Sequence, residues 1–201
     1  MMPETIRVRG RNGQGRERLL AAAATLFGER GFEAVSTKEL ALAAEVTIGS
    51  LYHHFASKEA IYQAALMEAL DALPAAPIEA VARLQPREAM ELQVAWFSEA
   101  VLREPLVRQE LLSPHLDQPL AELPFFRDSL AQFRRLVPIG APGVDPQLAI
   151  GAIISLCFGM TSLKGLGGLY APPADTAALA RLIVKLVLDG PEQIHHLHNI
   201  R

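Results

Sequence analysis

The sequence predicts an all-α protein of 201 residues, and three observations carry that prediction. Apolar residues recur at three- and four-residue intervals along several segments, which is the period of one helix face. An alternation of apolar and polar residues typical of strands never lasts beyond a few positions. Half of the residues are apolar and a fifth are charged, so the chain can bury a sizeable core and is not globally disordered.

The first predicted helix is RERLLAAAATLFGER, which ends before Gly31. Its apolar positions follow the helical period: Leu19, Ala23, Leu26 and Phe27. Glycine commonly ends a helix in the left-handed conformation. Ser36-Thr37-Lys38-Glu39 then has the S-x-x-E spacing of a capping box ahead of an apolar run, which predicts a second helix of two turns, TKELALAAE.

A third short helix, SLYHHF, follows Val46–Gly49, a stretch without strong helix formers. Ser57 and the next two residues predict the start of a fourth helix, which continues through Leu66. Two short helices joined by a tight turn, with a longer helix on either side, match the helix-turn-helix pattern. Helices this short are marginal alone, so their neighbours must bury them. A small helical bundle without a role in DNA binding is the alternative.

The stretch STKELALAAEVTIGSLYHHFASKEAIY resembles the DNA-binding domain of TetR-family transcriptional regulators. The resemblance spans about residues 16–66 and includes the AAAATLFGERGF helix, the AxxAEV entry to the turn, the G-S-L-Y-x-H-F helix and the S-K-E-A helix start. It implies a DNA-binding domain at 13–73, with the helix-turn-helix motif at about 36–55, and a helical effector-binding and dimerisation domain at 74–201. It also implies a cytoplasmic repressor, not an enzyme, that binds a palindromic double-stranded DNA as a homodimer.

The resemblance assigns roles within this motif. Phosphate contacts would come from hydroxyl, imidazole and ammonium groups: Thr37, Tyr52, His54 and Lys58. Base edges would meet the start of the third helix and the residue one turn later: Thr47, Ile48, Gly49, Ser50 and His53. Ser36 and Lys38 complete the predicted DNA-binding set.

Positive charge is sparse in this motif, because no Lys or Arg lies between Lys38 and Lys58. The arginine–guanine contact, the commonest specific one, is therefore missing from the third helix, and we expect modest specificity per base. Lys38 and a basic N-terminal arm would assist. The arm carries five arginines: Arg7, Arg9, Arg11, Arg16 and Arg18. A solvated, disordered tail is the alternative interpretation of the arm.

The adjacent histidines His53 and His54 raise the question of a metal site. Neighbouring helical residues point about 100° apart, whereas helical metal-binding pairs are spaced i, i+3 or i, i+4. No Cys, Asp or Glu lies between Val46 and Lys58 to complete a site. We therefore expect no metal and no cofactor here. His195 and His198 have the i, i+3 spacing, but a frayed polar tail is the favoured interpretation.

An enzyme is not expected. Cys157 lies in the apolar segment LCFGM, where burial makes a thiol inert. The sequence contains no G-x-S-x-G, no H-E-x-x-H and no glycine-rich loop ending in G-K-[ST]. A single cysteine fits a reducing compartment, in keeping with a cytoplasmic protein. The other alternative is an interaction protein that keeps the DNA-binding domain, has a solidly packed second half and responds to no effector.

The second half of the chain is predicted to be helical. Four prolines divide its middle into short pieces: Pro105, Pro114, Pro119 and Pro124. The helices are LQPREAMELQVAWFSEAVLRE, FFRDSLAQFRRLV, an apolar helix from Leu148 and APPADTAALARLIVKLVLDG. The apolar run Leu148–Leu163 is short for a membrane span, so we expect a buried helix and no membrane partner.

Aromatic residues in this half are predicted to line a pocket for a small, mostly apolar effector: Trp96, Phe97, Phe125, Phe126, Phe133 and Phe158. Glu99, Gln132 or His115 would supply polar anchors, and ordinary core packing is the alternative for each aromatic residue. The apolar helix and the last helix together predict a dimer seam, with small residues that permit close helix approach and a stripe of larger apolar ones: Ala152, Ser155, Gly159, Leu179, Ile183 and Leu186. An ordinary monomer core is the alternative for the seam.

Overall fold

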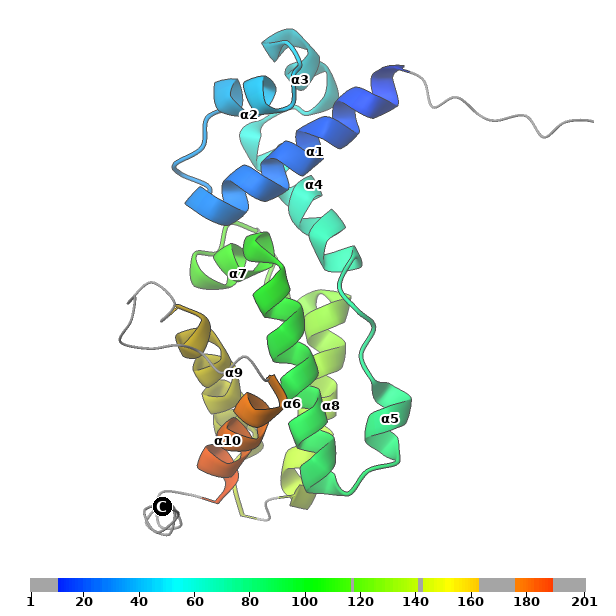
Figure 1. The fold of residues 1–201 in the computed structure, drawn as a ribbon, viewed down its shortest axis with the longest axis vertical. Coiled ribbons are helices and arrows are strands. Elements are labelled where there is room, and N and C mark those ends of the chain that lie inside the picture. The colour runs from blue at the N-terminus through cyan, green and yellow to red at the C-terminus, as the bar shows by residue number, and fades with distance from the viewer. Residues whose placement is uncertain (1–10, 117, 141–142, 163–175, 190–201) are drawn as a thin grey trace, which may run out of the picture. The chain divides into compact units, whose positions relative to one another are not determined.

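The computed structural model describes residues 11–116, 118–140, 143–162 and 176–189, and every regular element within these ranges is a helix (Figure 1). The all-α prediction is therefore confirmed for this part of the chain. None of its helices is both long enough and apolar enough to span a bilayer. The helices form two compact units, which are described separately.

The first unit contains the described residues up to Leu73 together with those from Glu104 to Leu116. Its helices are α1 (Arg11–Arg30), α2 (Thr37–Ala43), α3 (Ile48–His54), α4 (Lys58–Asp71) and α7 (Pro105–Leu112). The long helix α1 packs against each of the other four. The expected division into 13–73 and 74–201 therefore needs correction for the α7 segment, which packs on α1 and α4.

Local capping explains where the short helices begin. Ser36 forms the predicted capping box with Glu39 at the start of α2, and Ser57 accepts the Ala60 amide at the start of α4. Thr47 accepts the Ser50 amide, so α3 begins at Ile48, two residues before the predicted SLYHHF segment. Gly31 ends α1 with a φ of 79°, as predicted from its position.

The core of the first unit is formed by apolar residues contributed by each of its helices. Eight of them are completely buried: Leu19, Ala23, Phe27, Leu40, Leu51, Ile61, Leu66 and Val107. The α1–α7 packing depends on Gly28, since a Cβ atom built there would lie 2.9 Å from Pro105 Cβ and 3.1 Å from the Leu106 amide nitrogen. This close approach helps to hold α7 in the first unit.

The second unit contains α5 (Ile78–Ala82), α6 (Pro86–Arg103), the 3₁₀ turn η1 (Leu120–Glu122), α8 (Pro124–Gly140), α9 (Pro146–Ser162) and α10 (Thr176–Leu188). Helix α6 is its centre, because it packs against α5, α8, α9 and α10. One face of α6 is buried, with its apolar residues at helical spacing: Met90, Val94, Phe97 and Val101. Arg87 joins α6 to the end of α10 by two bonds to the Asp189 carboxylate, of 2.8 and 2.9 Å.

Candidate nucleic-acid interface

Helix α3 turns one side into the first unit and leaves the other exposed. Leu51 is completely buried, whereas Ile48 is 38% exposed and Tyr52 is 51% exposed. Thr47, Gly49 and His53 are exposed as well. The outer side of α3 therefore presents most of the residues predicted to meet base edges, on a helix that its buried residue anchors.

Two hydroxyl groups bridge the outer surfaces of α2 and α3. Thr37 Oγ1 lies 3.4 Å from Tyr52 Oη, and either atom can donate. Thr37 is the first residue of α2, so its hydroxyl is close to amides that have no partner inside the helix. Hydroxyls and helix N-termini are groups that bind phosphate oxygens. The fold thus brings together two predicted phosphate ligands that are 15 residues apart in the sequence.

Three other predicted DNA-binding residues belong to the helix caps. Ser36 Oγ accepts the Glu39 amide at 3.2 Å, and the Glu39 carboxylate accepts the Ser36 amide at 2.9 Å. These bonds with Ser36, aided by Arg30, lower the pKa of Glu39 to about 2. Thr47 caps α3 through the Ser50 amide at 3.1 Å. The primary effect of these polar groups is to set where α2 and α3 begin.

Lys58 is engaged inside the first unit, which differs from its predicted role in binding phosphate. Its Nζ donates to the carbonyl oxygens of Phe32 at 3.0 Å and Val35 at 3.2 Å. The ammonium also lies 4.0 Å from the centroid of the Phe32 ring. Lys58 therefore ties the α1–α2 loop to the start of α4, a role that local sequence signals did not reveal because the acceptors are backbone carbonyls.

His54 is partly buried against α1, and a Cβ built at Gly15 would lie 3.1 Å from its Nε2. His53 is exposed, and its ring centroid is 5.3 Å from that of His54. Within the ranges that the structure describes, no three His, Cys, Asp or Glu side chains are grouped so as to hold a metal ion. His195 and His198 lie outside those ranges. Lys38 is exposed on α2, while Arg16 lies 5.5 Å from the centroid of the Phe55 ring.

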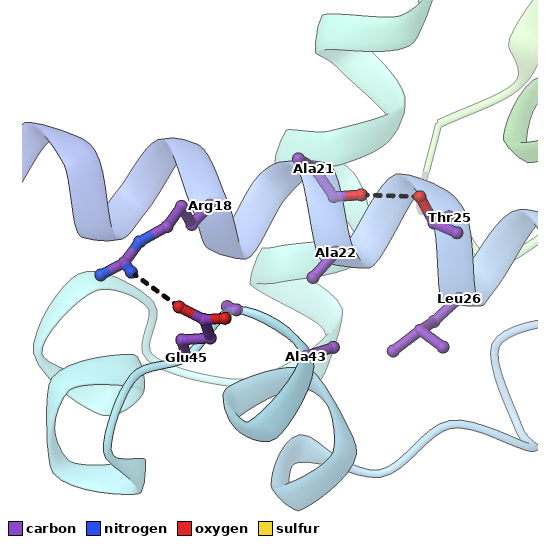
Figure 2. A pocket seen from close by; sticks show the side chains of 8 residues that line it. Arg18, Ala21, Ala22, Thr25, Leu26, Ala43 and Glu45 are labelled. Carbon is purple, nitrogen blue, oxygen red and sulfur yellow. Dashed lines mark hydrogen bonds and ion pairs between the residues drawn. The ribbon is translucent and has the colours of Figure 1, made fainter.

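A groove of about 480 Å³ lies on the first unit between α1 and the end of α2. Figure 2 shows its lining, with Arg18 paired to Glu45 at 3.7 Å and the Thr25 hydroxyl bonded to the Ala21 carbonyl at 3.1 Å. The remaining walls are small or apolar, and no residue of the predicted DNA-binding set lines the groove. It is therefore separate from the exposed surface of α3.

The predicted effector residues are largely brought together in the second unit. The Phe97 ring centroid lies 6.1 Å from that of Phe126 and 6.4 Å from that of Phe133. The Trp96 ring centroid lies 5.0 Å from that of Phe125. The side chain of Phe158 lies outside the described part. His115 belongs to the first unit, where its ring packs on Phe32 and Tyr62.

The predicted dimer residues divide into two groups. Ser155 and Gly159 are exposed on α9, Ala152 is partly exposed beside them, and Leu186 on α10 is also partly exposed. Leu179 and Ile183 are instead 3% and 0% exposed within a single chain. Their assignment to the seam is corrected, because α10 packs on α6 and α9 and uses these two side chains in the unit's own core.

An exposed second helix in a helix-turn-helix pair is the arrangement by which DNA-binding regulatory proteins enter the major groove. The model for bacterial regulatory proteins of the tetR family matches residues 19–65, which span α1 to α4. This part of the chain therefore matches the TetR family of bacterial regulatory proteins.

Curated relatives support this assignment over part of their length. The chain is 43% identical over 93 residues to the HTH-type transcriptional repressor KstR2 of Rhodococcus jostii, covering 46% of this chain and 45% of that protein. It is 43% identical over 53 residues to the regulator UidR of Escherichia coli K12, covering 26% and 27% of the two chains. The matched region thus spans less than half the length of these relatives.

Solved structures extend the likeness over most of the chain. The TetR-family regulator PfmR of Thermus thermophilus is 28% identical and has a TM-score of 0.66, covering 88% of this chain and 100% of that one. HlyIIR, a haemolysin II transcriptional regulator, is 21% identical with a TM-score of 0.65, covering 89% and 99%. The second likeness concerns the fold alone.

Proposed function

We propose that this chain is a transcriptional repressor that binds a palindromic double-stranded operator as a homodimer in the cytoplasm. A small, mostly apolar effector would release it. The observation that carries the proposal is the exposed side of α3 beside the Thr37–Tyr52 hydroxyl pair. The family and the curated repressor relatives support the same function.

Phosphate and base contacts would divide between the two short helices. The hydroxyls of Thr37 and Tyr52 would hold one phosphate, which positions the domain without reading sequence. Ile48 would contact a thymine methyl group in the major groove. At Gly49 nothing but the Thr47 hydroxyl comes within 4 Å of an added Cβ, so the helix backbone can approach the bases closely. Exposed Lys38 supplies positive charge beside these contacts.

The homodimer would form through the exposed side of α9. Leu148 there is 74% exposed, and Gly151, Ser155 and Gly159 continue the same side of the helix. An added Cβ at Gly151 or Gly159 would meet no atom within 4 Å, so a partner helix can approach this side closely. A dimer would place two α3 helices in successive major grooves, about 34 Å apart.

An effector would act by binding the DNA-released conformation better than the DNA-bound one. The aromatic cluster of α6 and α8 supports a binding site for an apolar body. The FadR regulator of Bacillus subtilis, whose structure is in complex with stearoyl-CoA, has a similar fold. It is 17% identical to this chain, with a TM-score of 0.61. We expect coupling of about 5- to 150-fold between effector and operator, with the same factor in both directions.

The test is selection of duplex DNA from a random library, followed by binding measurements at several salt concentrations. Affinity should fall steeply with salt, because phosphate contacts dominate it. Thr37→Val and Tyr52→Phe should weaken binding to all sequences alike, whereas Thr25→Val on α1 serves as the matched control. Ile48→Ala should change the preference at one base pair by about 1–3 kcal/mol. Failure to bind any duplex at low salt would exclude the proposed function.

A further inference from the structure

Three side chains of the second unit have buried polar atoms without a hydrogen-bond partner among the residues that the structure describes. They are Gln93 and Trp96 on α6 and Gln132 on α8. Gln93 is completely buried, and both polar atoms of each glutamine are unpaired. Burying an amide without a partner is costly, and folded proteins leave few such groups unpaired. These side chains therefore call for an explanation beyond core packing.

The register of α6 and α8 places the two glutamines at the same level. The helices pack together and run in opposite directions (Figure 1). Phe97 lies between Phe126 and Phe133, at ring distances of 6.1 and 6.4 Å. Gln93 is one helical turn before Phe97, and in an antiparallel pair that turn leads toward Phe133 and its neighbour Gln132.

Trp96 belongs to the same stretch of the α6–α8 contact. Its ring centroid lies 5.0 Å from that of Phe125, and Gln132 follows Phe125 by two helical turns on the same stripe of α8. The Phe97 ring centroid lies 6.0 Å from that of Phe125 and 6.4 Å from that of Phe133, so the helical register places the three polar side chains along the same stretch of the α6–α8 contact as these rings.

The chemistry of these atoms selects for an uncharged acceptor. Two amide NH₂ groups and one indole N–H provide more donors than the two amide oxygens provide acceptors. The cationic side chains of α8 that the structure describes are exposed: Arg127, Arg134 and Arg135. An anionic group placed among neutral donors would lose its hydration without gaining a counter-charge. An uncharged carbonyl oxygen needs no counter-charge and can accept hydrogen bonds from the same donors.

We propose that Gln93, Trp96 and Gln132 bind the polar head of the effector, and that this head is an uncharged carbonyl group on an otherwise apolar molecule. The inference rests on the proposed effector-responsive function and narrows it to a chemical class. It separates carbonyl compounds such as esters from the free acids of the same chain length.

The test uses the full chain and the emission of Trp96, which is the single tryptophan of the sequence. The probes are the methyl esters of octanoic, decanoic and dodecanoic acids, each compared with its free carboxylate. At least one ester should shift the emission and bind about tenfold or more tightly than its carboxylate. Gln93→Leu and Gln132→Leu should each weaken ester binding by about tenfold.

The same variants test the unpaired amides without any ligand. Because leucine has a similar volume and no polar atoms, each substitution should raise the melting temperature of the ligand-free protein by about 2–8 °C. Gln118→Leu makes the same change at an exposed position and should alter neither property. A fall in melting temperature for both variants would show that internal water pairs the amides, and would overturn the inference.

Two further results would overturn it: carboxylates that bind as tightly as the esters, or esters that leave the emission of Trp96 unchanged. The titrations contain no DNA, so their outcome is independent of operator binding. Ester binding without any DNA binding would exclude the proposed repressor function and would support the proposed ester-binding site. DNA binding without ester binding would exclude the proposed ester-binding site and leave the proposed repressor function standing.

Discussion

The Tyr62 hydroxyl donates a hydrogen bond of 2.7 Å to Glu110 Oε2, joining α4 to α7 inside the first unit. The buried carboxylate also accepts the backbone amides of His115 at 3.0 Å and Leu116 at 2.9 Å. Glu110 therefore organises the turn that follows α7 and attaches it to α4. A charge is tolerated in this core because both of its oxygens are paired.

Tyr62→Phe should destabilise the protein by about 1–3 kcal/mol, because the substitution removes a charge-assisted bond and leaves Glu110 with one partner fewer. Urea unfolding followed by circular dichroism measures this loss. Tyr52→Phe removes an exposed hydroxyl from α3 and should change stability little. Equal effects of the two substitutions would contradict the importance of the buried bond.

Alkaline pH should reveal the same interaction. Burial, followed by the bond to Glu110 and its negative charge, raises the pKa of Tyr62 well above its ordinary value of 10.0. The unfolded tyrosine loses its proton near pH 10, whereas the folded one keeps it. The contribution of the Tyr62–Glu110 bond to folding stability is therefore complete below that pH and decreases above it. The stability difference between the wild type and Tyr62→Phe should therefore shrink as pH rises from about 9 to about 11. A constant difference would show that Tyr62 titrates alike in both states.

Acidic pH should weaken the α2 cap. The pKa of Glu39 is lowered from 4.5 to about 2, first by the Ser36 amide and then by the Ser36 hydroxyl and Arg30. The contribution of the ionised Glu39 carboxylate to folding stability is present above pH 4.5 and is lost as pH falls toward 2. Glu39→Gln should melt at a lower temperature than the wild type at neutral pH, and this difference should decrease over that interval. Glu29→Gln, at an exposed position of α1, is the control.

Alanine substitution should affect stability at one glycine and DNA binding at another. Gly28→Ala should destabilise the first unit by about 1–3 kcal/mol, because its Cβ would meet Pro105 and the α7 backbone. A Cβ atom at Gly49 on α3 would make only an ordinary van der Waals contact, so the fold of Gly49→Ala should persist. Operator affinity should fall, because the methyl group would hinder the close approach of the backbone to the bases. Thermal unfolding and a DNA-binding titration on both variants separate the effects. Loss of folding in Gly49→Ala would contradict this distinction.

Substitutions on α9 and α10 should distinguish the dimer surface from the core. Ser155→Glu on the exposed side of α9 should yield a folded monomer, since it places like charges across the proposed seam. Ile183→Lys should yield unfolded or insoluble protein, because it buries an unpaired charge inside the chain. Light scattering and circular dichroism provide the readout. A wild type that is monomeric at micromolar concentration would exclude the proposed seam.

Local sequence signals were sufficient to predict the succession of helices from α1 to α4. The Ser36–Glu39 spacing predicted a capping box, and Gly31 predicted the end of α1. These features depend on residues within one or two turns of each other, so the pattern contains all the participants. The exposed side of α3 followed from the same reasoning, because Leu51 is the residue that anchors this short helix to its neighbours and the opposite side is left exposed.

Contacts between distant residues were decided by the tertiary structure alone. Lys58 binds carbonyls 26 and 23 residues away, and Tyr62 pairs with a carboxylate 48 residues away. The apolar period of α10 predicted that Leu179 and Ile183 would be covered, but not that α6 and α9 of the same chain would cover them. Hydrophobic periodicity identifies the side of a helix that must leave water, whereas the three-dimensional packing determines which neighbour covers it.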